Sequence, residues 1–184
     1  MATRSSSRNS TRARDEILAM LKDDHKRVRK AFRDFEKLDV HEDAEAVEAL
    51  VQRACSELEL HAALEEELFY PAARDAMREE DLLDEAEVEH MTAKMLIGQL
   101  KGMGADDEKF AATFTVLGEY VKHHVKEEEK ELFEQLMRAR IDWPSLLEEM
   151  QQRRTELMEE MGLAAPQAEP AEDGGAAARS AARA

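Results

Sequence analysis

Two stretches of the sequence, HAALEEELFYP at residues 61–71 and HHVKEEEKELF at residues 123–133, decide which fold the chain predicts. Each stretch contains a histidine four residues before a glutamate. On a helix, positions i and i+4 lie on one face about 6 Å apart, so the imidazole and the carboxylate can reach one ion or two adjacent ions. The pairs that fall within the apolar faces of their helices are His61/Glu65 and His124/Glu128.

A lone histidine precedes each pair and directly follows an acidic residue. The first lies 36 positions before His61, and the second lies 34 positions before His124. Two histidines and a glutamate, repeated at such similar spacing, are difficult to explain as a solvated run of charges. The repeat predicts a metal site assembled from four helices, and its six candidate ligands are His25, His61, Glu65, His90, His124 and Glu128.

The composition predicts an all-α protein of one domain. The chain has 184 residues, of which 43% are hydrophobic and 37% charged, with only 7 Gly and 4 Pro. This length is sufficient for a substantial core, and strong helix formers occur throughout the chain. No apolar run is long enough for a membrane span, and no apolar segment follows the N-terminus as in a secretory signal.

Charge and cysteine content restrict the partners and the compartment. The net charge of −16 argues against nucleic-acid binding. The single cysteine, Cys55, cannot form an internal disulfide and gives no indication of an oxidising compartment. We therefore expect a cytoplasmic protein without nucleic-acid or membrane partners, in which Cys55 is a buried, unreactive thiol.

Apolar residues recur with helical period in four segments and predict an up-down-up-down four-helix bundle over residues 14–139. The segments are about 15–38, 44 into the seventies, 81–103 and 106–138. A fifth helix over 140–162, with Asp142 as N-cap and Gly162 as its end, should pack on the bundle or form a homodimer. Residues 1–13 read as a disordered basic tail and 163–184 as a flexible tail.

The six polar candidates interrupt otherwise apolar faces, and this requires a physical reason. Buried carboxylates and imidazoles are costly unless another charge compensates them. A metal ion supplies that charge, and a nitrogen and oxygen ligand set without thiolate favours iron, manganese or zinc. Two carboxylates and four histidines divide naturally between two ions, although a single ion is also compatible with them.

The order His, His-x3-Glu, His, His-x3-Glu resembles that of haemerythrin-like HHE domains. The resemblance covers residues 15–138 approximately and includes the phrases EEELFYP and EEEKELF. It implies a non-haem centre of two iron ions, held by the six candidates inside a four-helix bundle. It also implies that Glu65 and Glu128 bridge the irons, and that manganese or zinc is the less usual occupant.

The resemblance also implies a range of functions, and two departures bear on them. Oxygen-carrying members have a further histidine where this chain has Lys94, and their last acidic ligand lies five rather than four residues after its histidine. We expect a protein that binds or senses dioxygen, iron, or a related ligand such as peroxide or nitric oxide. The alternatives are a di-iron enzyme of oxidase or peroxidase type and a bundle that holds metal for stability. His41 and His123 are expected to lie outside the site.

Overall fold

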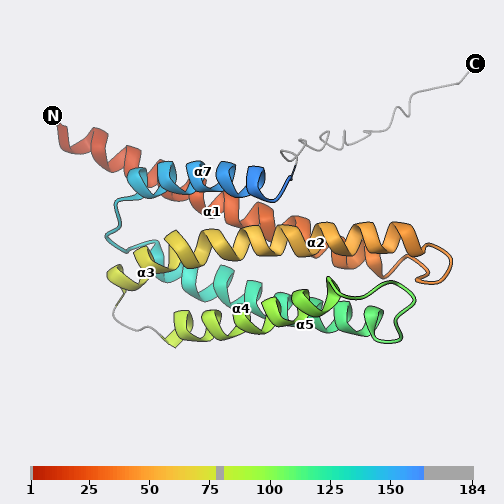
Figure 1. Cartoon of the computed structure of the whole chain (residues 1–184). Helices are drawn as coiled ribbons and strands as arrows, with labels where there is room; N and C mark the ends of the chain where they lie inside the picture. The colour runs from red at the N-terminus through yellow and green to blue at the C-terminus, as the bar shows by residue number, and fades with distance from the viewer. Residues whose placement is uncertain (1, 78–80, 164–184) are drawn as a thin grey trace, which may run out of the picture.

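The computed structural model describes residues 2–77 and 81–163, with side chains from residue 7 onward. Four antiparallel helical rods form a bundle, and a further helix packs on its outside (Figure 1). The all-α, up-down-up-down prediction is confirmed. The rods are α1 (Ala2–Phe35), α2 (Ala44–Leu64) continued by α3 (Tyr70–Ala76), α4 (Asp81–Leu100), and α5 (Phe110–Glu127) continued by α6 (Phe133–Leu136). The outer helix is α7 (Trp143–Glu160).

The basic N-terminal segment is helical, which corrects the prediction of a disordered tail over residues 1–13. Helix α1 begins at Ala2 and extends beyond the bundle (Figure 1). The segment contains no Gly or Pro, and the Arg12 guanidinium pairs with Glu16 one turn later at 2.7 Å. Ala13 is already buried against the core. The prediction of disorder rested on composition alone and did not take account of contacts along the helix.

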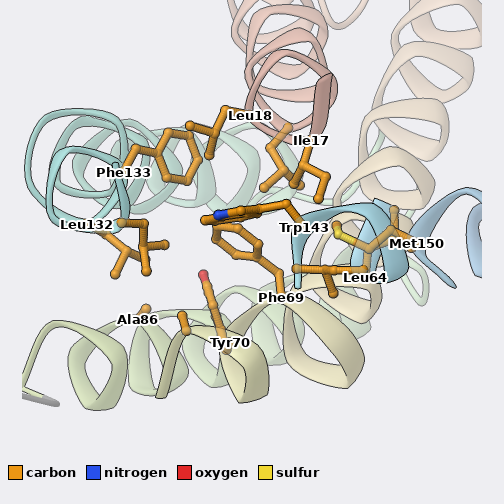
Figure 2. Packing of buried hydrophobic residues seen from close by; sticks show 14 of the residues in the cluster. Ile17, Leu18, Leu64, Phe69, Tyr70, Ala86, Leu132, Phe133, Trp143 and Met150 are labelled. Carbon is orange, nitrogen blue, oxygen red and sulfur yellow. The ribbon is translucent and has the colours of Figure 1, made fainter. Parts of the chain in front are cut away.

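The apolar core is divided into two clusters. One cluster lies where α7 covers the bundle, and Figure 2 shows its side chains meeting around Phe69 and Trp143. The other lies toward the α1–α2 and α4–α5 connections and includes Phe110 and Phe114. In every rod, the buried polar residues lie close to the boundary between the two clusters. A polar layer therefore crosses the middle of the bundle.

Helix α7 packs against α1 and α2 of its own bundle. The Asp142 side chain caps its first turn by accepting from the backbone N–H of Ser145, as the sequence predicted. Gly162, two residues after the helix ends at Glu160, has a φ of 63°, which lies in the left-handed region that glycine adopts without steric cost. Because α7 buries its apolar face within the chain, a homodimer through this helix stays a prediction.

Two further expectations concern membrane spans and the C-terminal tail. Among the described residues, no helix is long and apolar enough to cross a membrane. The flexible tail predicted for 163–184 lies, from residue 164 onward, outside the described residues.

Replacing Met150 with Ala should lower the free energy of unfolding by about 2–5 kcal/mol, because the side chain is fully buried between α7 and the bundle. Met137→Ala is the matched control: this methionine is 47% exposed, so its loss should cost less than about 0.5 kcal/mol. Chemical denaturation of the two variants measures both values. Equal effects would show that α7 does not contribute to the core.

Candidate metal centre

The six predicted residues come together in the polar layer, and all six are buried. They form two groups that share Glu65. The first group consists of His25, His61, Glu65 and Glu128, and the second of Glu65, His90 and His124. Within each group, one potential ligand atom per residue lies within 4.8 Å of all the others.

The histidines face each other in two pairs through their Nε2 atoms. The Nε2 atoms of His25 and His61 are 3.1 Å apart, and those of His90 and His124 are 3.2 Å apart. The first pair joins α1 to α2, and the second joins α4 to α5. Each pair thus connects two consecutive rods of the bundle.

Each histidine turns its other ring nitrogen, Nδ1, toward a carboxylate at the edge of the layer. Three of these contacts are hydrogen bonds: His25 to Glu129 at 3.0 Å, His90 to Glu66 at 3.0 Å and His124 to Glu89 at 2.9 Å. In the fourth, His61 Nδ1 lies 3.5 Å from Asp24, within ion-pair distance but outside good hydrogen-bond geometry. A carboxylate at Nδ1 holds the ring proton there and leaves the Nε2 lone pair directed inward.

The two glutamates link the histidine pairs. Glu65 Oε2 lies 3.1 Å from the Nε2 of His61 and 3.4 Å from that of His90. Glu128 Oε2 lies 3.2 Å from the Nε2 of His25 and 3.8 Å from that of His124. Each carboxylate therefore lies close to one histidine of each pair, so it could contribute to either half of the site.

The donor set fits metal ions because several of its atoms lack hydrogen-bond partners. Two neutral imidazoles cannot hydrogen-bond through facing lone pairs, so each Nε2 pair needs a proton or a cation. Glu65 Oε1 and Glu128 Oε2 are buried without a hydrogen-bond partner, although buried polar atoms are normally paired. Nitrogen lone pairs and carboxylate oxygens that converge in this way form a cation-binding environment.

Electrostatics within the layer couple His61 to Glu65. Burial by itself would lower the pKa of His61, but Glu65 and Asp24 outweigh burial and raise this pKa well above its usual value. Burial would raise the pKa of Glu65, yet the neighbouring imidazoles, His61 first, hold it below the usual range. Without a metal, a proton on His61 therefore compensates the carboxylate, so protons and metal ions compete for the same nitrogen.

Two π-helical turns, η1 (Glu65–Phe69) and η2 (Glu128–Leu132), begin at the glutamates of the site. In each, the backbone N–H of the residue after the turn bonds to the carbonyl five residues earlier, on Glu65 or Glu128. The helical rods continue through both turns. Pro71 lies in the first turn of α3, where its missing N–H is tolerated and does not interrupt the rod.

The turn η1 brings Tyr70 to the site, which periodicity along the sequence did not indicate. In a regular α-helix, a residue five positions after Glu65 points well away from it, whereas a π turn places the two on one face. The Tyr70 hydroxyl lies 3.2 Å from Glu65, 3.3 Å from Glu128 and 3.4 Å from His90 Nε2. Burial first, then the two carboxylates, raise the pKa of Tyr70 well above its usual value, so it is a neutral hydrogen-bond donor.

Lys94 is not buried among the ligands. Its ammonium is half-exposed and forms an ion pair with Glu66, which in turn contacts His90 Nδ1. Lys94 and Tyr120 also line a cavity of about 30 Å³ that reaches all four histidines of the site. The remaining wall of this cavity is largely apolar and includes Val28, Leu58, Ala93, Ile97, Val121 and Val125.

The other candidates lie outside the polar layer. His41 belongs to no metal-capable group among the described residues. His123 is 58% exposed and contacts Glu127 at 3.2 Å on the surface. Cys55 is buried, and burial raises the pKa of its thiol to about 11, as expected for an unreactive cysteine.

Comparisons with known proteins agree with the helical-bundle fold. The chain is similar in structure to a Hemerythrin HHE cation-binding domain-containing protein from Mycobacterium kansasii, with a TM-score of 0.60 and 21% identity over 76% of this chain and 85% of that one. No curated protein sequence matches the chain. The sequence profile of the Hemerythrin HHE cation binding domain matches residues 16–136, which include all six buried candidates. The chain therefore belongs to the hemerythrin HHE cation-binding domain family.

Proposed function

We propose that this protein holds a non-haem centre of two iron ions and uses it to bind or sense dioxygen, iron or a related small ligand. The observation that carries the proposal is the position of the glutamates. Glu65 and Glu128 each reach one histidine of both pairs, and each retains a buried oxygen without a partner. Two pairs of imidazoles that share two carboxylates suit two ions better than one.

When bound, the iron ions supply redox activity and coordination positions for a small ligand such as dioxygen, peroxide or nitric oxide. The carboxylates at each Nδ1 hold the ring protons and orient the histidines, as second-layer groups commonly do in metal sites. The Tyr70 hydroxyl supplies a proton donor beside both glutamates. The narrow, largely apolar cavity excludes bulky molecules and thereby favours small neutral ligands.

Lys94 supports an enzyme as the second candidate, one that acts on oxygen, peroxide or nitric oxide. The ammonium has no lone pair for a metal, and its ion pair with Glu66 turns it toward the surface. The position thus supplies no fifth imidazole. A centre with more open coordination positions admits water and substrate more readily, which favours turnover over reversible binding.

We expect about two iron ions per chain after anaerobic loading, because the two histidine pairs provide separate nitrogen donors. His124→Ala should reduce this to about one, since it removes half of the second pair. His123→Ala changes the neighbouring, exposed histidine and should leave two. Elemental analysis measures all three proteins. One ion in the wild-type chain, unchanged by His124→Ala, would contradict a dinuclear centre.

Ferrous wild-type protein should be oxidised by dioxygen and stay oxidised after the gas is removed. Lys94→His restores an imidazole one helical turn after His90 and should leave a larger ferrous fraction. Lys94→Gln removes the charge without adding a ligand and serves as the control. Stopped-flow absorbance and a ferrous assay follow the reaction. Quantitative return of the wild type to the ferrous state would identify it as a reversible oxygen binder.

The metal-free protein should be more stable at about pH 6 than at about pH 8. The raised pKa of His61 means that its contribution is complete below the unfolded value of about 6.5 and is lost as the pH rises through the folded value. The lowered pKa of Glu65 acts only in strongly acidic solution, outside this window. His61→Gln should flatten the dependence and His123→Gln should retain it. Thermal unfolding midpoints test this, and a wild-type midpoint that rises with pH would refute it.

A further inference from the structure

The carboxylate beside His61 differs from the three that contact the other histidines. The side chain of Asp24 is only 2% exposed, whereas those of Glu129, Glu66 and Glu89 are 24%, 30% and 17% exposed. A buried carboxylate needs a partner that compensates its charge and holds its orientation. The structure supplies that partner from α7.

Arg154 binds Asp24 with two parallel hydrogen bonds. Its Nη1 donates to Oδ2 at 2.8 Å and its Nη2 donates to Oδ1 at 2.6 Å. The guanidinium side chain is 15% exposed, so the contact is largely shielded from water. Arg27 also contacts Oδ1, but from a position that is 33% exposed. The two-pronged contact with Arg154 fixes the plane of the carboxylate, which a single cation cannot do.

The same carboxylate faces the metal-directed histidine of α2. Asp24 Oδ2, which accepts from Arg154, lies 3.5 Å from His61 Nδ1. Among the described residues, no other group forms a hydrogen bond with that nitrogen, so Asp24 is its polar contact. If Asp24 turned away, nothing described would hold the ring proton of His61 at Nδ1, and the Nε2 lone pair would no longer be fixed toward the centre.

We propose that Arg154 is a positioning residue for the metal centre: by clamping Asp24, it orients His61 as a ligand and makes α7 part of the site. Helix α7 lies outside residues 16–136, the part of the chain that matches the family. The four rods supply the ligands themselves, while α7 supplies the charge that holds one of them in place. This role rests on the proposed metal centre.

Arg153 provides a matched control on the same helix. Its guanidinium binds Glu67 at 2.7 Å and Glu160 at 3.1 Å, and neither carboxylate contacts a histidine of the centre. Arg153→Gln therefore removes an ion pair between α7 and the bundle, and another within α7, without disturbing the contact to His61. Arg154→Lys keeps the positive charge but loses the two-pronged geometry.

The test is the release of ferrous iron from the loaded full-length protein into excess chelator. Arg154→Gln should accelerate release about 10- to 100-fold, which is the usual effect of removing a group that holds a metal ligand in place. Arg153→Gln should change it less than about twofold. In a double-variant cycle, Arg154→Gln should add nothing once Asp24→Asn is present, because the two residues act through one contact. Unfolding midpoints of the metal-free variants measure any purely structural effect.

Each outcome is decisive. Release from Arg154→Gln at the wild-type rate, even with a lowered metal-free midpoint, would make Arg154 a structural residue only and overturn the proposal. Additive effects in the double-variant cycle would do the same. Should Arg154→Gln not fold, release from Arg154→Lys at the wild-type rate would also overturn it, and faster release would support it. A wild-type chain that binds no iron would instead refute the metal centre itself.

Discussion

The structure depends on imidazole nitrogens that face each other at 3.1 Å and 3.2 Å in a layer shielded from water. Two neutral imidazoles repel in this arrangement when both protons are held on Nδ1, and two buried glutamates surround them. Such a layer is stable only with positive charge in it. Protons can supply that charge in the metal-free chain, and metal ions supply more of it at the same atoms. This competition connects folding, pH and metal binding in one set of residues.

The rest of the bundle holds this layer in a fixed shape. Apolar clusters on both sides exclude water, which strengthens every electrostatic contact between them. The two π turns begin at the glutamates and let the rods continue while they present additional residues on the inner face. Tyr70 reaches both carboxylates for this reason. The helix irregularities therefore lie where the chemistry requires them, as is common for π turns.

The carboxylates that contact the histidines at Nδ1 differ in their solvent exposure. One edge of the site is therefore more open than another. Glu66 is 30% exposed and pairs with Lys94, which lines the cavity where a small ligand can approach. Asp24 lines the same cavity but is only 2% exposed, because Arg154 of α7 shields it from solvent. An open edge suits ligand entry, and a closed edge suits rigid support of a ligand.

The sequence by itself determined the four rods, the fifth helix and the six residues that meet in the polar layer. These follow from local rules: helical period places them on inner faces, and a buried polar residue must meet a compensating charge. Local rules also misjudged the N-terminal segment, where polar composition suggested disorder and contacts along the helix stabilise α1 instead.

Only the tertiary structure decided which carboxylate faces which histidine, because residues far apart in sequence supply these contacts. Glu89 reaches His124 from another rod, and Arg154 reaches Asp24 from a helix 130 positions away. Tyr70 escaped the sequence analysis for a different reason. A regular period of 3.6 residues cannot represent a π turn, and the extra residue in that turn rotates Tyr70 onto the face that carries Glu65.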